Sequence, residues 1–379
     1  MAILRNTYQT ADMRRSGWRF FDYFTLILVI ALITLGVLMI NSATLNTTDP
    51  DLAGAPRRQA IYAIVGIAVM LITALIDYRI WQNARHGLYG AAIVFLLITL
   101  VFGTGEIGGV GRWLTFMAAF PVQPAELAKV LMILSLAGFL ADRRDEMDQF
   151  KNVVLSLVYI GLPAGLVFLQ PNLSTAVVFI FIWLGMMITN GVRAQHLAVI
   201  GGLGLAAMPI VWLAMAQYQR DRLLSFLSPD RNPGAKYNLD QALIGIGSGG
   251  WLGQGYSTGS QSQLHFLKVR HTDFIFSVTA EELGFVGAVL LLALFALLLY
   301  RLLRIADKAR DSYGELVVVG VAAMIFFQTV INIAMNLNLG VVAGLPLPLV
   351  SYGGSSLITM LLAIGLAQSV IMRHKTIEF

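Results

Sequence analysis

The chain has 379 residues, of which 57% are hydrophobic and only 12% are charged, and its mean hydropathy is +0.74. Soluble domains carry about a quarter charged residues, so this composition excludes an ordinary soluble protein, and so apolar a chain is not disordered either. Cysteine is absent, which excludes disulfides and thiolate sites, and the net charge of +5 is scattered between apolar runs, which excludes the basic face of a nucleic-acid-binding protein. The chain is therefore predicted to be an all-α polytopic membrane protein that forms a single domain over residues 1–379.

Ten apolar runs predict ten transmembrane helices, because a bilayer core of about 30 Å requires roughly 20 apolar residues per helix. The first run follows four arginines and is longer than the apolar core of a signal peptide, so it is read as a retained span. In chain order the predicted spans are Phe24–Ser42, Ala60–Ile76, Leu88–Phe102, Ala125–Leu140, Val153–Leu169, Leu173–Thr189, Leu197–Ala216, Phe274–Leu299, Leu316–Leu337 and Ser355–Met372.

Arginine and lysine are distributed unequally between alternate short loops, and the richer side is expected to be cytoplasmic. That side carries the N-terminal arginines and Arg79, Arg85, Arg143, Arg144, Lys151, Arg193, Arg301, Arg304, Lys308, Arg310, Arg373 and Lys375. Both termini are therefore predicted to be cytoplasmic.

A long loop is predicted over residues 217–272, between the seventh and eighth spans and on the extracytoplasmic side. Loops longer than about 12–15 residues are usually functional or disordered. This one contains apolar patches, so we expect it to pack against the membrane face of the protein. His265 and His271 are too few for a metal site, and no metal ligands are predicted.

Asp273 lies where this loop meets the eighth span. Carboxylates close to hydrocarbon are costly and are functional candidates by default. Thr272 or Asp273 can cap the helix, and the helix dipole together with Arg270 would keep the Asp273 carboxylate ionised. An N-cap without a catalytic role is an equally good interpretation.

Three other features are candidates for a functional or a structural role. Glu126 and Lys129 are three residues apart on the fourth span, where they can form a structural ion pair or leave Lys129 to contact an anionic headgroup. Glu281 and Glu282 lie within the eighth span, where they can serve a proton path or brace the helix. Residues 344–356 interrupt an apolar segment with Pro and Gly, which predicts the wall of a cavity or a loop that only packs.

Over nearly its whole length the chain resembles the SEDS family (shape, elongation, division and sporulation). The matching stretches are Arg112–Leu114, Gln123–Lys129, Gln261–Leu264, Arg270–Phe276, Ala280–Gly284 and Pro348–Ser356. Residues 219–222 and 246–250 favour the elongation branch, RodA, over the division branch, FtsW. The chain departs from the family at Asn172, where the family usually has Asp.

The resemblance implies a peptidoglycan glycosyltransferase of the bacterial cytoplasmic membrane that polymerises lipid II on the extracytoplasmic side. It also implies a class B penicillin-binding protein as partner, beside lipid II, the growing glycan chain and membrane lipids. The matching Asp of the family is essential, and the Glu and Lys that match Glu126 and Lys129 are functionally sensitive. Whether a divalent cation such as Mg²⁺ joins the site is left open.

The residues fit a mechanism in which Asp273 is the general base for attack of a sugar hydroxyl, with inversion and release of undecaprenyl pyrophosphate. The leaving diphosphate requires cations. The predicted substrate-binding residues are Arg112, Glu126, Lys129, Arg220, Lys268, Arg270, His271 and Ser351. A lipid II flippase or proton-coupled transporter, and a scaffold for the penicillin-binding protein, are the alternatives.

Overall fold

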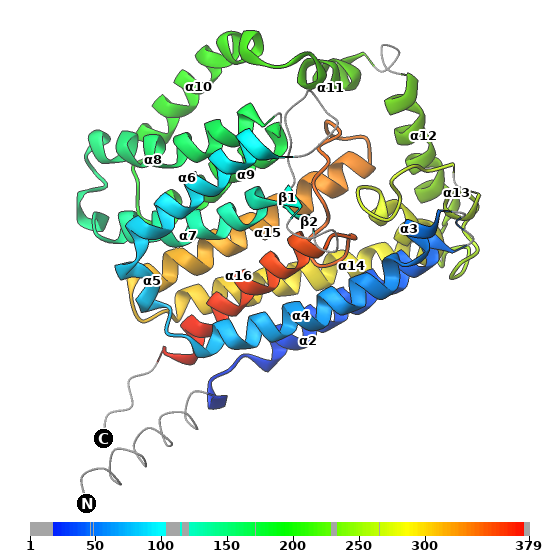
Figure 1. Cartoon of the computed structure of the whole chain (residues 1–379), viewed down its shortest axis with the longest axis horizontal. Coiled ribbons are helices and arrows are strands. Elements are labelled where there is room, and N and C mark those ends of the chain that lie inside the picture. The colour runs from blue at the N-terminus through cyan, green and yellow to red at the C-terminus, as the bar shows by residue number, and fades with distance from the viewer. Residues whose placement is uncertain are drawn as a thin grey trace, which may run out of the picture.

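The structure, a computed structural model, describes residues 18–45, 47, 49–103, 114–115, 121–170, 172–228, 233–264 and 266–374. Within these residues, ten long helices correspond one for one to the ten predicted spans (Figure 1). They are α2 (Tyr23–Thr44), α4 (Ala55–Leu75), α6 (Arg85–Phe102), α7 (Pro124–Ala141), α8 (Phe150–Leu169), α9 (Leu173–Thr189), α10 (Ala194–Ala214), α14 (Ile275–Asp307), α15 (Ser312–Asn336) and α16 (Gly354–Met372). In the described part of the chain, nine of the ten are long and apolar enough to span a membrane, and α9, with 17 residues, falls just short of the length criterion.

The shorter elements connect these helices. They are α3 (Pro50–Ala53), α5 (Arg79–Asn83), a 3₁₀ turn (Arg144–Glu146), α11 (Gln217–Leu227), α12 (Pro233–Ser248), α13 (Ser260–Gln263) and a two-stranded antiparallel ribbon of β1 (Leu114–Thr115) and β2 (Pro121–Val122). The described residues of 217–272 therefore include three helices, where the sequence predicted a loop. As expected, this segment packs on the bundle, with α12 against α14 and α15.

Helices α7, α15 and α16 form the centre of the bundle, because most of their residues are buried. Helix α16 packs along α4, and α15 packs against α9 and α14 (Figure 1). The peripheral helix α10 has no buried residue although it is strongly apolar. Its exposed leucine and isoleucine side chains are explained by contact with lipid, which satisfies apolar surface as a protein core does.

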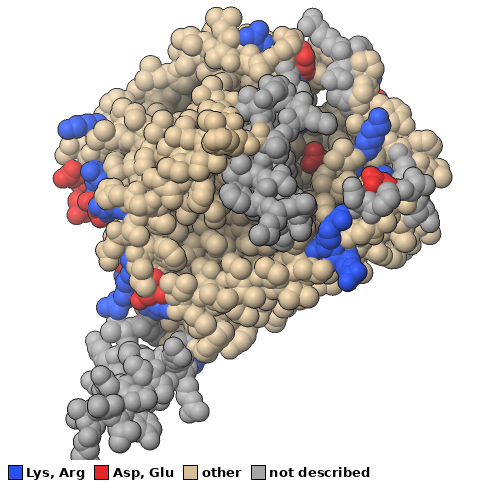
Figure 2. Space-filling view, in the orientation of Figure 1, with Lys and Arg blue, Asp and Glu red and all other residues tan. Residues whose placement is uncertain are grey.

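Charged side chains are distributed unevenly over the surface of the molecule (Figure 2). Outside the grey residues, Figure 2 shows a broad uncharged central region, with Lys, Arg, Asp and Glu gathered toward opposite sides. The start of α2 and the end of α16 lie at one end of the bundle, and α11, α12 and α13 lie toward the other (Figure 1). Both described ends of the chain therefore lie on the same side, as an even number of spans requires.

Helix α14 is broken near its start. Gly284 has φ 68° and ψ −166°, a conformation that glycine adopts without steric cost. The backbone of residues 250–255 enters this break, where Phe285 N–H donates to the Gly250 carbonyl at 2.8 Å and Gln254 N–H donates to the Glu281 carbonyl at 3.0 Å. The outer segment is therefore joined to α14 through main-chain hydrogen bonds.

Glu281 and Glu282 strengthen the same junction. The Glu281 carboxylate accepts from the backbone N–H groups of Gln261 at 2.7 Å and Ser262 at 3.1 Å. Glu282 accepts from the hydroxyls of Ser42 and Ser262. The bracing role is therefore the one that the contacts support, with backbone N–H groups and serine hydroxyls as the donors.

Candidate active site

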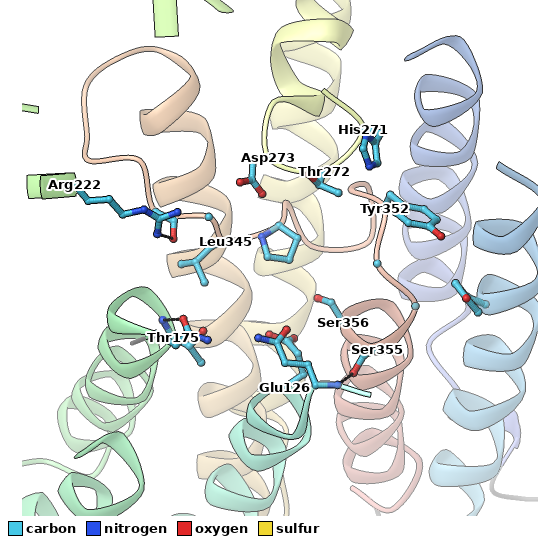
Figure 3. Close-up of a pocket in the computed structure, with 18 residues that line it drawn as sticks. Glu126, Thr175, Arg222, His271, Thr272, Asp273, Leu345, Tyr352, Ser355 and Ser356 are labelled. Atoms are coloured by element: carbon cyan, nitrogen blue, oxygen red, sulfur yellow. Dashed lines mark hydrogen bonds between the residues drawn. The ribbon is translucent and has the colours of Figure 1, made fainter. Parts of the chain in front are cut away.

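A cavity of about 390 Å³ lies at the end of the bundle where α11, α12 and α13 are found. Figure 3 shows its walls converging from α7, α9, α11, the residues before α14 and the segment between α15 and α16. The residues that line it are Tyr62, Gln123, Glu126, Asn172, Thr175, Arg222, His271, Thr272, Asp273, Ala343, Gly344, Leu345, Pro346, Tyr352, Gly353, Gly354, Ser355 and Ser356. The Pro/Gly-interrupted segment thus forms a cavity wall, which confirms that interpretation over simple packing.

Asp273 lies just before α14 with its carboxylate in this cavity (Figure 3). The N-cap residue of α14 is Phe274, and no side chain caps the helix, so the prediction of a Thr272 or Asp273 cap is wrong. The Thr272 hydroxyl instead donates to the Val269 carbonyl at 3.2 Å. Because the Asp273 carboxylate is not used as a cap, it remains available to a ligand in the cavity.

Two asparagines of α15 fix the main chain at Asp273. The Nδ2 groups of Asn332 and Asn336 donate to the Asp273 carbonyl at 3.1 and 3.0 Å. Asn332 Nδ2 also donates to the Leu345 carbonyl at 2.8 Å, which connects the cavity wall to the same point. Both asparagines are fully buried. Neither asparagine was predicted from the sequence, although two amides one helical turn apart in an apolar span are a recognisable signal.

Arg222 of α11 lines the cavity together with Asp273 (Figure 3), and both side chains lie close to Gly344. A Cβ atom built on Gly344 would lie 3.2 Å from Arg222 Nη2 and 3.7 Å from Asp273 Oδ2, so both side chains approach the same point beside this glycine. Burial raises the pKa of the Asp273 carboxyl, and the Arg222 guanidinium partly opposes this by lowering it. Arg270, the cation predicted for that electrostatic role, does not line the cavity.

Arg270 is placed elsewhere. Its side chain is buried, and its Nε donates to the Ala43 carbonyl near the end of α2. Arg220 Nη2 donates to the Leu213 carbonyl at 2.8 Å, and Lys268 is exposed. In the described structure none of these three predicted substrate-binding cations lines the cavity. Arg112, the fourth, lies outside the described residues.

Glu126 and Lys129 form a buried ion pair at the base of the cavity. Lys129 Nζ lies 2.8 Å from Glu126 Oε1, and Lys129 has no exposed surface. Glu126 lines the cavity, whereas Lys129 does not. The second carboxylate oxygen of Glu126 is buried without a hydrogen-bond partner among the described residues. The pair is therefore neutralised internally, with one acceptor left over beside the cavity.

Of the two remaining predicted residues, His271 lines the cavity and Ser351 does not. His271 lines the cavity, and its pKa is lowered by burial and by the neighbouring Arg270 charge. The Ser351 hydroxyl donates to the Thr272 carbonyl at 2.6 Å and accepts from the Leu347 N–H at 2.8 Å. Ser351 is thus a positioning residue that joins the wall segment to the residues before α14.

Tyr352 extends this connection. Its backbone N–H donates to the His271 carbonyl at 2.9 Å, and its hydroxyl accepts from Arg58 Nε at 3.0 Å. Asn172 lines the opposite wall and caps α9 by accepting from the Thr175 N–H at 3.3 Å. The departure from the family at this position therefore preserves an N-cap, which Asp would also provide.

A resident metal has no evident protein ligands in the described part of the chain, where no group of three or more His, Asp or Glu side chains could hold an ion. The polar groups around the cavity are instead two carboxylates, a guanidinium, an imidazole, amides, hydroxyls and backbone groups. Such a set suits recognition of a sugar and its phosphate.

Comparisons with known proteins agree with the resemblance. The family model described as cell cycle protein, FtsW/RodA/SpoVE, matches residues 23–376. The chain is 37% identical over 360 residues to the peptidoglycan glycosyltransferase MrdB of Escherichia coli K12, covering 94% of this chain and 95% of that protein. A solved structure described as coordinating polymerization and crosslinking in a peptidoglycan synthase complex matches with a TM-score of 0.80 and 33% identity, covering 93% of this chain and 98% of that one. The rod shape determining protein RodA of Thermus thermophilus matches with a TM-score of 0.68 and 32% identity, covering 93% and 96%.

Proposed function

The chain belongs to the FtsW, RodA and SpoVE family, and we propose that its activity, peptidoglycan glycosyl transfer, takes place in the cavity around Asp273. The observation that carries this proposal is a carboxylate and a guanidinium that line one cavity and both lie close to Gly344. The substrate is lipid II, and the product is a β-1,4-linked glycan strand used for cell elongation.

In this mechanism Asp273 is the general base. The 4-hydroxyl oxygen of the acceptor GlcNAc forms a bond with C1 of the donor MurNAc, and its proton passes to the Asp273 carboxylate. The bond between C1 and the pyrophosphate oxygen breaks at the same time, so an α-linked donor gives a β-linked product. A positioned base of this kind contributes roughly 10²–10⁴-fold to the rate.

The environment of Asp273 supports this role. A general base is most effective when its pKa approaches the working pH. Burial raises the pKa of this carboxyl in that direction, while Arg222 favours its ionised form. The buried asparagines hold the main chain of Asp273, which reduces the reorganisation needed when a substrate binds.

Arg222 is also the cation that we assign to the leaving diphosphate. A pyrophosphate leaves as a stable anion and requires positive charge more than a proton. Arg222 lines the cavity, whereas Arg220, Lys268 and Arg270 do not. Arg112 stays a prediction of the sequence for the same task.

We place the cavity on the extracytoplasmic side of a bacterial cytoplasmic membrane. The chain is a membrane protein, and its described ends lie at the end of the bundle opposite the helices of segment 217–272 (Figure 1). The arginine-rich and lysine-rich loops favour a cytoplasmic location for those ends. A class B penicillin-binding protein that crosslinks the product is the partner we propose, because one matching structure is described as a complex that coordinates polymerization and crosslinking.

The carboxylates that a proton-coupled transporter would use are occupied by structural contacts in this protein. Glu281 and Glu282 are occupied by hydrogen bonds that hold the outer segment. Lys129 is paired with Glu126. No contact in the described residues favours a proton path over a bracing role for these side chains.

The test is polymerisation by the purified full-length chain in detergent with fluorescent lipid II, where there is no membrane to cross. Asp273→Asn is expected to slow glycan formation by roughly 10²–10⁴-fold while lipid II binding persists. Asp240→Asn is the matched control, because Asp240 is exposed on α12 and does not line the cavity. Normal polymerisation by Asp273→Asn would refute the mechanism.

A further inference from the structure

A second cavity lies at the other end of the bundle, between the start of α2 and the ends of α14 and α16. Its volume is about 270 Å³. The charged and titratable side chains that line it are Arg19, Asp22, Arg301, Arg304, Lys308 and His374. Nothing in the glycosyl-transfer mechanism uses this cavity, which is separated from Asp273 by the length of α14.

The charges of this cavity do not cancel. Asp22 is its one lining acid, and Arg301 binds both Asp22 oxygens, at 2.8 and 3.0 Å. Arg19, Arg304 and Lys308 have no carboxylate within ion-pair distance among the described residues. Three cationic groups around one small cavity repel one another, and a bound anion would remove that repulsion.

The surroundings place the cavity at the level of lipid headgroups. Trp18, Tyr23 and Tyr300 are exposed near it, and aromatic side chains of this kind collect at the membrane–water interface. The apolar side chains of Phe21 and Ile305 also line the cavity. A ligand in this cavity would contact both cationic and apolar side chains. The phosphate and the adjoining glycerol backbone of a phospholipid can make both kinds of contact.

We propose that this cavity binds the phosphodiester headgroup of an anionic phospholipid from the inner leaflet. Basic pockets between transmembrane helices on the cytoplasmic side are suited to anionic headgroups. Arg304 and Lys308 lie one turn apart near the end of α14, and Arg19 approaches from the residues before α2. A zwitterionic choline headgroup carries a compensating cation and is disfavoured by the same three charges.

Binding is expected to brace three helices that already meet at this point. The Asp22 N–H donates to Gln368 Oε1 and Gln368 Nε2 donates to the Asp22 carbonyl, both at 3.0 Å, which joins α2 to α16. Arg301 joins α2 to α14. A ligand that binds only the folded protein raises its melting temperature.

The test uses the full-length protein in a neutral detergent at low salt, titrated separately with dioctanoyl phosphatidylglycerol, dioctanoyl phosphatidylcholine and inorganic phosphate, with thermal unfolding as readout. Phosphatidylglycerol is expected to raise Tm, and the other two are not. Arg304→Gln/Lys308→Gln is expected to weaken phosphatidylglycerol roughly 30-fold, because each basic side chain near the surface contributes about a fivefold factor. Both side chains are exposed, so the substitutions are expected to leave folding intact.

Lys151→Gln/Arg310→Gln is the matched control, since it removes two exposed basic charges outside this cavity, one at the start of α8 and one after the end of α14. An equal loss in this control would mean general surface attraction and would overturn the site. A rise in Tm with inorganic phosphate as large as the rise with phosphatidylglycerol would overturn the lipid assignment in favour of a soluble phosphate compound. The absence of any shift with phosphatidylglycerol would overturn the proposal entirely.

Discussion

Arg222 and Asp273 come from segments about fifty residues apart, yet both approach Gly344, where a built Cβ would lie 3.2 Å from Arg222 Nη2 and 3.7 Å from Asp273 Oδ2. The part of the cavity beside Gly344 is where a hydroxyl could lose a proton to Asp273 next to a diphosphate bound by Arg222. Three variants test the roles of the base, the cation and the glycine one at a time.

Arg222→Gln is expected to change the pH dependence of polymerisation. The guanidinium lowers the pKa of the Asp273 carboxyl, so its removal raises that pKa and moves the acid limb of kcat/KM to higher pH. Loss of the cation that faces the leaving group should also reduce kcat on the order of 10²-fold. The control is Arg220→Gln, whose side chain donates to the Leu213 carbonyl outside the cavity. An unmoved acid limb in Arg222→Gln would show that the two groups do not interact.

Gly344→Ala is expected to lose both stability and activity. Gly344 has φ +62°, where a Cβ costs roughly 1–2 kcal/mol, and that Cβ would crowd Arg222. Gly191→Ala is the matched control, because Gly191 has φ +80° with no atom within 4 Å of a built Cβ. Similar losses of unfolding free energy in both variants, with activity lost only in Gly344→Ala, would separate the site from backbone strain. Full activity in Gly344→Ala would contradict the close approach.

Asp273→Asn is expected to stabilise the protein as pH rises. The unfolded chain releases the Asp273 proton near its ordinary pKa of about 3.9, whereas burial raises that pKa in the folded protein. Because the unfolded state ionises first, the wild type loses stability above about pH 4 until pH passes the folded value. Asparagine does not ionise, so the Tm advantage of the variant should grow across that window and then level off. Thermal unfolding at a series of pH values measures this, and a constant difference would refute the raised pKa.

The ten spans follow from sequence because a run of about 20 apolar residues has few other uses. Helices α11 and α12 were not predicted, because a search for apolar runs does not detect helices that contain many polar residues or glycines. The sequence favours Arg270 because it lies three residues from Asp273. Arg222 comes close to Asp273 only through the tertiary fold, which distance along the sequence does not reveal. Asn332 and Asn336 could have been found, since buried amides in a span require partners.

The Glu126–Lys129 pair is best tested by a double-mutant cycle. Either Glu126→Gln or Lys129→Met leaves one buried group unpaired, and breaking a buried pair costs about 3–5 kcal/mol. The double variant should recover much of that loss, as measured by the free energy of unfolding in detergent. Its polymerase activity then separates the two interpretations of the sequence. A stable but inactive double variant would indicate that Glu126, which lines the cavity, contacts substrate, whereas a stable and active one would indicate a structural pair.

Glu281→Gln is expected to release the outer segment without changing the chemistry at Asp273. The carboxylate accepts from the Gln261 and Ser262 N–H groups, and hydrogen bonds to a charged group contribute about 1.5–3 kcal/mol each. Amide hydrogen exchange around residues 257–263 should therefore accelerate, with little change in exchange at the opposite end of the bundle. Glu315→Gln is the control, because Glu315 pairs with Arg144 at that opposite end. The acid limb of the pH profile for polymerisation should be unchanged in both variants, since neither glutamate lines the cavity. A protein that used Glu281 to carry protons would show the reverse, with ordinary exchange at 257–263 and a displaced pH profile.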